Sequence, residues 1–281
     1  MKLLTYRRPG AANEAGVLMG AGQVAPLAAA GLNCCVSALG ALDKVREYAA
    51  SNPATIPLSS VKLMAPIPRP PKLICVGLNY RDHAIESKME IPKVPTIFNK
   101  FPNVVIAPGD PIVLPANSEK PDYEAEFAFV IGKGGRHIKA ERWHEHVAAY
   151  TMVNDVSARD FQMATTQWLM GKTFDTFAPM GPYLVTADEI PDPHALDISL
   201  EIDGEVLQSS NTRELIFGVP QLVEYLSSVV TLEPGDVVST GTPSGVGFAR
   251  KPPRWLKPGD SVVVKVAGLG ELRNPVVAEA V

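Results

Sequence analysis

Prolines and glycines divide the apolar parts of this sequence into short runs. The chain contains 26 prolines and 22 glycines among its 281 residues. Proline interrupts helix interiors because it lacks an amide hydrogen, and glycine favours turns, so this pattern is typical of many short strands joined by turns. The sequence therefore predicts a β-rich fold of the mixed α/β class.

A proline-dense segment at residues 66–71 separates two parts of unequal length. Its sequence, PIPRPP, favours a stiff, extended linker whose prolines cannot donate hydrogen bonds to a neighbouring strand. We expect residues 1–65 to form a small N-terminal domain and residues 72–281 to form a larger domain with a core of its own.

The apolar pattern also predicts where individual elements lie. In the larger part, strands are expected at residues 72–77, 96–98, 127–131, 150–155, 198–202, 237–239 and 261–266. Helices are expected at residues 39–50 and 219–230. A shorter helix should start at Ser157, because Asp160 three residues later completes a variant of the capping box.

Composition excludes several classes of partner. The formal net charge of -4 and the isoelectric point near 5.8 provide no basic surface for nucleic acid. No apolar stretch approaches the roughly 18 residues of a membrane span, and the first residues lack a signal-peptide core, so we expect no membrane partner and a cytoplasmic location. The three cysteines show neither a disulfide pattern nor zinc-ligand spacing, which fits a reducing compartment.

The sequence Asp122-Tyr-Glu-Ala-Glu126 places two glutamates one residue apart. On a strand, Glu124 and Glu126 would project from the same face. A solvated strand face is the common explanation for such a pair. Here, however, the strand continues with apolar residues on both faces, so acids at its start need a counter-charge, which a bound cation would supply.

A third acid, Asp155, ends the next predicted strand. Three oxygen donors without nearby cysteine or histidine select Mg²⁺, Mn²⁺ or Ca²⁺ over zinc, and we expect Mg²⁺ or Mn²⁺. The spacing between Asp155 and Glu126 is not a local motif, so the sequence alone does not show that the three acids meet.

Eight ordered stretches resemble the fumarylacetoacetate hydrolase superfamily across nearly all of residues 70–277. They are VGLNYRDHAIE (76–86), PTIFNKF (95–101), DYEAEFAFVIGKGGRHI (122–138), NDVSARDFQ (154–162), GKTFDTFAPMGP (171–182), QSSNT (208–212), PGDVVSTGTPSGVG (234–247) and LKPGD (256–260). The wordings KTFDTFAPMGP, QSSNT and RKPP are especially similar to the subgroup named after fumarylacetoacetate hydrolase domain-containing protein 2 and its bacterial relatives.

The resemblance implies a rolled, mixed β-sheet of the fumarylacetoacetase C-terminal domain type with a small N-terminal α+β domain, and a homodimer. It implies a divalent metal held by Glu124, Glu126 and Asp155. It also implies a catalytic dyad of His83 and Glu86 on a lid helix. Five further positions correspond to the substrate pocket of the family: Lys100, Arg159, Gln162, Lys172 and Thr242.

Elementary chemistry is consistent with these roles but leaves alternatives. On a helical turn, Glu86 can accept a hydrogen bond from one imidazole nitrogen of His83 and leave the other as a base, although a surface pair has the same spacing. Lys172 could hold a substrate carboxylate or form a local salt bridge. Thr242 lies in a glycine-rich stretch that either contacts an anion or forms a turn between strands.

A small 2-oxo acid could chelate the metal, which would stabilise an enolate. The first hypothesis is hydrolysis of a C–C bond in acylpyruvate or fumarylpyruvate substrates through a metal-bound enolate. The alternative is an oxaloacetate keto–enol tautomerase or decarboxylase that uses the same site, which the subgroup resemblance favours. A third hypothesis, a metal-stabilised binding protein without catalysis, predicts loss of the dyad or of a ligand, and neither is lost.

Overall fold

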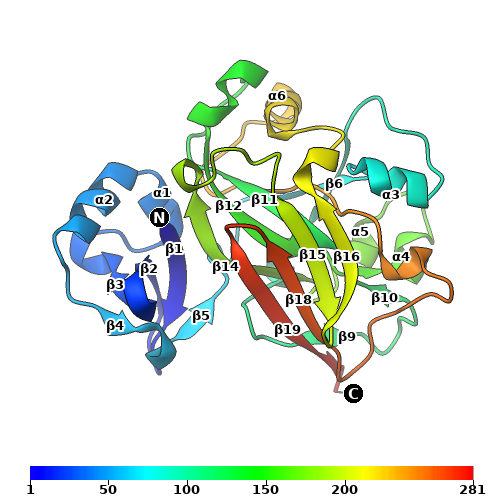
Figure 1. Ribbon diagram of the computed structural model, residues 1–281, viewed down its shortest axis with the longest axis horizontal. Coiled ribbons are helices and arrows are strands. Elements are labelled where there is room, and N and C mark those ends of the chain that lie inside the picture. The colour runs from blue at the N-terminus through cyan, green and yellow to red at the C-terminus, as the bar shows by residue number, and fades with distance from the viewer. Residues whose placement is uncertain (281) are drawn as a thin grey trace.

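Residues 1–280 of the computed structural model form three β-sheets with short helices around them, and Val281 lies outside the described residues (Figure 1). The largest sheet has 12 strands, with the central order β4-β3-β2-β1-β14-β12-β11-β17-β6-β7. A five-stranded sheet, in the order β16-β15-β18-β19-β9, packs against it, and β10 and β13 form a two-stranded ribbon. The predicted fold class is confirmed.

The strands of the largest sheet are β1 Lys2–Arg7, β2 Asn13–Met19, β3 Gln23–Pro26, β4 Ile56–Pro57, β5 Lys62–Met64, β6 Leu73–Gly77, β7 Thr96–Lys100, β8 Val105–Ile106, β11 Ala125–Ile131, β12 Val147–Asn154, β14 Ala178–Thr186 and β17 Val237–Ser239. The five-stranded sheet contains β9 Ile112–Leu114, β15 Asp197–Ile202, β16 Glu205–Asn211, β18 Ser261–Val266 and β19 Gly270–Ala278, and the ribbon consists of β10 Pro121–Asp122 and β13 Ser157–Ala158. The α-helices are α1 Cys35–Leu39, α2 Leu42–Ala50, α3 Arg81–Glu86, α4 Arg159–Gln162, α5 Leu169–Lys172 and α6 Val219–Val229.

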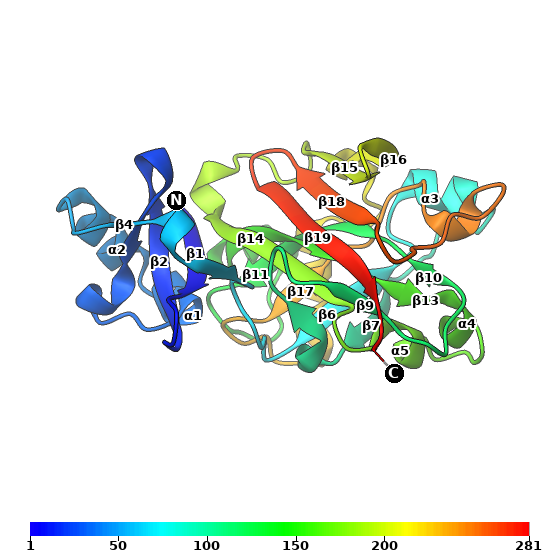
Figure 2. The same cartoon turned by 90° about the horizontal axis from the view of Figure 1, so that it is seen from below.

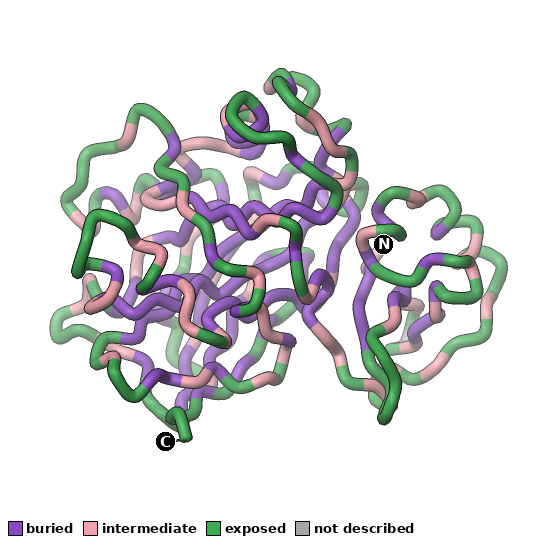
Figure 3. The backbone as a smooth tube through the Cα atoms, turned by 180° about the vertical axis from the view of Figure 1, so that it is seen from behind, coloured by how far each residue is buried: buried purple, intermediate pink, exposed green. Residues whose placement is uncertain are grey.

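The antiparallel pair β11 and β12 forms the centre of the larger body. All seven residues of β11 are buried, because one face packs towards the five-stranded sheet and the other towards a second apolar cluster. Figure 3 shows the buried backbone concentrated in these central strands, with exposed loops around them. A one-residue shift in register would move each side chain of β11 to the opposite face of the sheet. Because both faces are packed, the register of β11 is strongly specified.

The N-terminal strands extend the large sheet. They lie at the left in Figure 1, beside the larger body, and Figure 2 shows the same arrangement from below. Strand β1 pairs antiparallel with β14, with Lys2 opposite Val185, and the apolar cluster beneath them contains residues from both sides of the proline-rich segment. The sheet therefore crosses the predicted boundary at residues 66–71, and the division into two domains stays a prediction.

The predicted strands correspond to observed strands, whereas two helix starts were wrong. The helix expected at residues 39–50 is two helices, α1 and α2, that meet at Gly40. The short helix α4 starts at Arg159 rather than at Ser157, because Ser157 belongs to β13 and its hydroxyl donates to the carbonyl of Asp155. A local capping pattern does not show which partner the hydroxyl takes in the folded chain.

Three short helices gather at the end of the larger body opposite the N-terminal strands, with α4 packed against α5 (Figure 1). A Cβ atom on Gly171 of α5 would lie 2.4 Å from the backbone nitrogen of Gln162 in α4. This close approach brings the adjacent Lys172 into the interior. Within residues 1–280, no helix is long and apolar enough to cross a membrane.

Replacing Gly171 with alanine should destabilise the fold by about 1–3 kcal/mol, because the new methyl group overlaps backbone rather than a flexible side chain. Gly20→Ala is the matched control, since a Cβ atom at residue 20 would have no heavy atom within 4 Å, and its effect should stay within about 0.5 kcal/mol. Urea unfolding of both variants measures the difference. Equal stabilities would contradict the tight packing of α4 on α5.

Candidate metal centre and active site

Strand pairing brings the three predicted acids together. Ala125 at the start of β11 lies opposite Asn154 at the end of β12, so the residue before one strand meets the residue after the other. The backbone N–H of Asp155 donates to the carbonyl of Glu124 over 2.9 Å. One carboxylate oxygen from each of Glu124, Glu126 and Asp155 lies within 4.8 Å of the others, and all three residues are buried.

Cations compensate these buried carboxylates from two sides. Lys172 Nζ lies 2.7 Å from Glu124 Oε2 and 2.8 Å from Asp155 Oδ2. Lys100 Nζ donates to Asp155 Oδ1 over 2.5 Å and to the carbonyl of Val156 over 2.9 Å. Such pairs are required in the interior, because an unpaired buried charge is strongly destabilising.

The two glutamates have opposite pKa shifts. Burial alone would raise the pKa of Glu124, but Arg159 and Lys172 outweigh it and lower the pKa to about 2. Burial raises the pKa of Glu126 to about 8, and the neighbouring carboxylates of Asp155 and Glu124 add to the increase. Glu126 therefore holds a proton at neutral pH when no cation is bound.

Backbone and hydroxyl donors also fix Glu126. Its Oε2 accepts from Ser239 Oγ over 2.5 Å and from the N–H of Gly241 over 3.0 Å. Both donors follow or end strand β17, which pairs with β11. The carboxylate is thereby turned towards Glu124 and Asp155 rather than towards the core.

Seven carboxylate and cationic side chains are buried at this point: Asp122, Glu124, Glu126, Asp155, Lys100, Arg159 and Lys172. With every group ionised, the four carboxylates exceed the three cations by one negative charge. A divalent cation would convert this surplus into one net positive charge. The donor set, three carboxylates without a sulfur or imidazole ligand, fits a hard divalent metal such as Mg²⁺, Mn²⁺ or Ca²⁺.

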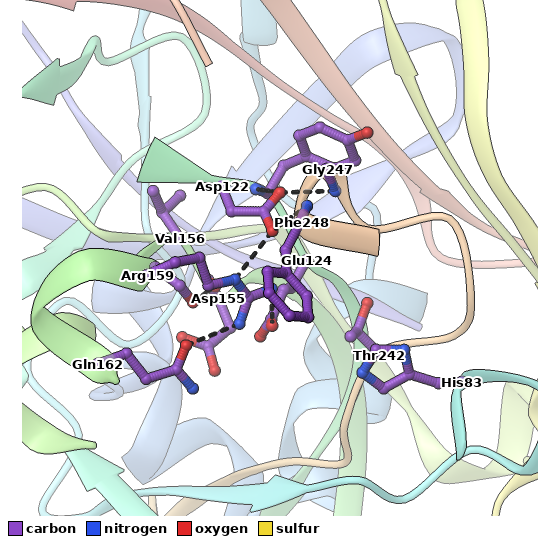
Figure 4. A network of polar contacts seen from close by, with 12 residues as sticks. His83, Asp122, Glu124, Asp155, Val156, Arg159, Gln162, Thr242, Gly247 and Phe248 are labelled. Atoms are coloured by element: carbon purple, nitrogen blue, oxygen red, sulfur yellow. Dashed lines mark hydrogen bonds and ion pairs between the residues drawn. The ribbon is translucent and has the colours of Figure 1, made fainter. Parts of the chain in front are cut away.

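The predicted dyad lies beside this cluster on α3. His83 Nδ1 lies 3.4 Å from Glu86 Oε2, and the carboxylate of Glu86 also accepts from the N–H of Gly245 over 3.0 Å. The His83 side chain is 14% exposed. Figure 4 shows its ring facing the space between Thr242 and Glu124. The imidazole can therefore exchange a proton with a molecule bound in that space.

A cavity of about 260 Å³ lies in front of the acids. Its lining residues are Val76, Gly77, Leu78, His83, Ser87, Met89, Phe98, Glu124, Glu126, Arg159, Gln162, Met163, Trp168, Lys172, Thr242 and Phe248. One side is charged, and the other is mostly aromatic and aliphatic. Such a division suits a small ligand that carries charge at the metal end.

Most of the predicted site residues line the cavity, and the others support those that do. His83, Arg159, Gln162, Lys172 and Thr242 line the cavity, as do the two glutamates. Three others do not: Glu86, Asp155 and Lys100. Glu86 holds His83, and Asp155 lies behind the wall with Lys100 beneath it. The substrate contact of Lys100 stays a prediction, and its observed role is to compensate the charge of Asp155.

Four contributors were not predicted from the sequence: Asp122, Trp168, Ser239 and Phe248. Asp122 is fully buried and bonded to Arg159, and its position two residues before Glu124 was the available signal. Trp168 lines the cavity from the residue before α5, and Phe248 lines it from a 3-10 helix at Gly247–Ala249. Nothing in their local sequence distinguishes them from other aromatic residues.

The sequence of this chain is similar to that of a known protein family and of known proteins. Residues 72–277 match the family described as Fumarylacetoacetate (FAA) hydrolase C-terminal. The mitochondrial oxaloacetate tautomerase of Xenopus laevis is 50% identical over 239 residues, covering 84% of this chain and 75% of that protein.

Two solved structures that resemble this one are named as enzymes with different activities. The 5-carboxymethyl-2-hydroxymuconate delta-isomerase of Mycobacterium smegmatis is 36% identical, with a TM-score of 0.81 over 99% of this chain and 100% of that chain. The maleylpyruvate hydrolase of Sphingobium sp. SYK-6, in complex with manganese(II) and pyruvate, is 30% identical, with a TM-score of 0.84 over 100% of both chains.

These names correct the expected cytoplasmic location. The matching relatives from Xenopus laevis, Rattus norvegicus and Homo sapiens are all named as mitochondrial. The expectation was wrong because it considered only apolar targeting segments, whereas mitochondrial targeting segments are amphipathic and rich in arginine. The expected homodimer and the expected lack of nucleic-acid and membrane partners stay predictions.

The family match covers most of the chain, and the relatives' names include a tautomerase, an isomerase and a hydrolase. Two of the features expected from the resemblance, the mixed β-sheet and the buried acidic cluster, are present in the structure. The chain therefore belongs to the fumarylacetoacetate hydrolase family.

Proposed function

We propose that this protein is a divalent-metal-dependent oxaloacetate keto–enol tautomerase, with Mg²⁺ or Mn²⁺ as its metal. The observation that carries the proposal is the 50% identity to a protein of that name, which extends over 84% of the chain. This is the alternative hypothesis from the sequence rather than the first one. The small, partly charged cavity is compatible with a four-carbon 2-oxo acid.

Charge supports an anionic substrate. With a divalent cation held by Glu124, Glu126 and Asp155, the buried groups carry one net positive charge. The pKa values of Lys172 and Arg159 are raised, because nearby carboxylates outweigh the burial that would lower them. Both side chains stay protonated near the cavity, so they can attract a carboxylate but cannot serve as bases.

The proton transfer is assigned to His83. Tautomerisation breaks a C–H bond at carbon 3 of the keto acid and forms an O–H bond at the oxygen on carbon 2. A bound metal would supply the positive charge that stabilises the developing enolate. The imidazole of His83 accepts the proton from carbon and returns it to oxygen, and Glu86 stabilises the intervening imidazolium from 3.4 Å.

Hydrolysis of a C–C bond is the second candidate. The observation that favours it is the same His83–Glu86 pair, which could instead remove a proton from water. The solved relative from Sphingobium sp. SYK-6 is named as a maleylpyruvate hydrolase and holds pyruvate. The two reactions differ in whether water or substrate carbon loses the proton, so product analysis separates them.

An assay with Mg²⁺ against enol-oxaloacetate, acetylpyruvate and fumarylpyruvate should show enol decay for oxaloacetate without release of pyruvate. The His83→Gln variant should lower kcat by about 10²–10⁴-fold, because it removes the proton carrier. His144→Gln, an exposed histidine outside the cavity, is the control and should leave kcat unchanged.

Other products would change the conclusion. Pyruvate from the acylpyruvates would establish a C–C hydrolase, and pyruvate from oxaloacetate alone would indicate a decarboxylase. No reaction with any of the three compounds would overturn the proposal.

Metal binding should depend on pH between about 6 and 8. Glu126 has a pKa of about 8 without metal, so a cation that binds below that pH must displace its proton. Mn²⁺ affinity should rise about tenfold per pH unit up to pH 8 and then level off. Calorimetry in buffers of different ionisation enthalpy should show release of about one proton at pH 7. The same affinity at pH 6 and pH 8 would contradict this assignment.

Trp168 should limit substrate size. Its ring lies against β6, where a Cβ atom on Gly77 would come within 2.3 Å of indole Cζ3, and it packs edge-on against Phe98 with ring centroids 5.5 Å apart. Trp168→Ala should raise kcat/KM for fumarylpyruvate relative to oxaloacetate at least about tenfold, by opening the apolar side of the cavity. Trp143→Ala removes an indole outside the cavity and should leave this ratio unchanged. An unchanged ratio in the Trp168 variant would exclude this size limit.

A further inference from the structure

Asp122 is a fully buried carboxylate outside the cavity lining that accepts four hydrogen bonds. Its Oδ1 accepts from the N–H groups of Tyr123, over 2.9 Å, and Gly247, over 2.8 Å. Its Oδ2 accepts from the N–H of Phe248 over 3.0 Å and from Arg159 Nε over 2.9 Å. The side chain therefore joins two segments that are far apart in the sequence. One is α4, and the other is the 247–248 loop, the part of the connection between β17 and β18 in which a 3-10 helix, Gly247–Ala249, begins.

Both segments form walls of the cavity. Arg159 Nη2 lies 2.6 Å from Glu124 Oε1, and Nη1 donates to Gln162 Oε1 over 2.8 Å. The guanidinium carbon of Arg159 lies 6.0 Å from the ring centroid of Phe248. Figure 4 shows the contacts of Asp122 reaching Gly247 on one side and Arg159 on the other. One carboxylate thus orients the arginine that contacts Glu124 and the aromatic residue above it.

The loop fits closely around this carboxylate. A Cβ atom on Gly247 would lie 2.6 Å from Asp122 Oδ1 and 2.0 Å from the carbonyl oxygen of Arg254. The backbone can reach Asp122 only because residue 247 is glycine. The position of the 247–248 loop is therefore determined by the carboxylate and by residues 254–256, whose Leu256 N–H donates to the carbonyl of Pro121.

Charge compensation alone does not explain this arrangement. Glu124 already pairs with Arg159, so a second buried carboxylate adds a desolvation cost without being needed to neutralise the guanidinium. Two of the four bonds go to consecutive backbone N–H groups of the loop, which carry no charge to neutralise. The bonds instead fix the orientation of the Arg159 guanidinium and the position of the Phe248 backbone, and with it the distance between the guanidinium and the Phe248 ring.

We infer that Asp122 is a positioning residue of the metal site. It fixes Arg159 so that Nη2 aligns the carboxylate of Glu124 for a divalent cation, and it fixes the 247–248 loop so that Phe248 closes the cavity. Metal affinity and the fit of a chelating ligand then depend on a side chain that contacts neither. Because Mn²⁺ binding is measured without turnover, the test below is independent of the reaction proposed above.

Asp122→Asn tests this role with little change in side-chain size. An amide group must place its NH₂ either at the Oδ1 position, facing the N–H groups of Tyr123 and Gly247, or at the Oδ2 position, facing the N–H of Phe248 and Arg159 Nε. Two of the four hydrogen bonds are therefore lost in either orientation. Calorimetric titration of the variant with Mn²⁺ should show affinity about 10–100-fold weaker than in the wild type. Titration of the Mn²⁺-loaded variant with oxalate, as a dicarboxylate chelator, should also show weaker binding.

Asp160→Asn is the matched control. The carboxylate of Asp160 also accepts three local bonds, from Ser118 Oγ and from the N–H groups of Glu119 and Phe161, but none of these partners lines the cavity. This variant should lose stability and keep the wild-type affinity for Mn²⁺. Wild-type affinities for Mn²⁺ and oxalate in Asp122→Asn would overturn the inference.

Arg159→Lys gives a second test that does not depend on the folding of Asp122→Asn. A lysine keeps the charge but has one nitrogen in place of the three that Arg159 directs at Asp122, Gln162 and Glu124, so Mn²⁺ affinity should fall by a similar factor. In the double variant the two losses should be less than additive, because both remove the same connection. Wild-type Mn²⁺ affinity in Arg159→Lys, or fully additive losses, would contradict a role that acts through Arg159.

Discussion

The burial of three carboxylates at the ends of β11 and β12 determines much of the architecture around them. Acids with 5% or less of their surface exposed require positive partners, and Lys100, Lys172 and Arg159 supply them from different elements. Each of these cations comes from a segment that must approach the same point. The edge strand β7 and the short helices α4 and α5 therefore converge there, which also creates the walls of the cavity.

The pKa values of the two glutamates shift in opposite directions, and this difference bears on cation binding. Glu124 contacts Arg159 and Lys172 and stays ionised, whereas Glu126 has only neutral donors, Ser239 and the Gly241 N–H, and retains its proton. Without metal, the proton on Glu126 therefore neutralises the surplus negative charge of the cluster. A divalent cation would remove that proton and leave the site positive, which links metal binding to the binding of an anionic substrate.

Local sequence signals predicted the parts of the fold in which one periodicity dominates. The buried strands β6, β11, β12, β15, β17 and β18 followed from their apolar runs, and the one-residue spacing of the glutamates indicated a shared face. Contacts between distant residues did not follow from local signals. The hydroxyl of Ser157 bonds to Asp155 instead of capping α4, and β1 joins β14 across the predicted domain boundary.

By itself, the sequence determined the oxygen-donor chemistry, the β-rich class and the family, because residue identity, period and ordered motifs are local properties. The meeting of Asp155 with the glutamates arises only in the folded chain, since it depends on the register of Ala125 against Asn154. The same is true of the contact of Lys100 with Asp155 and of the link that Asp122 forms between Arg159 and the 247–248 loop. These contacts join residues tens of positions apart, and the burial that makes them necessary arises only when the sheets have packed.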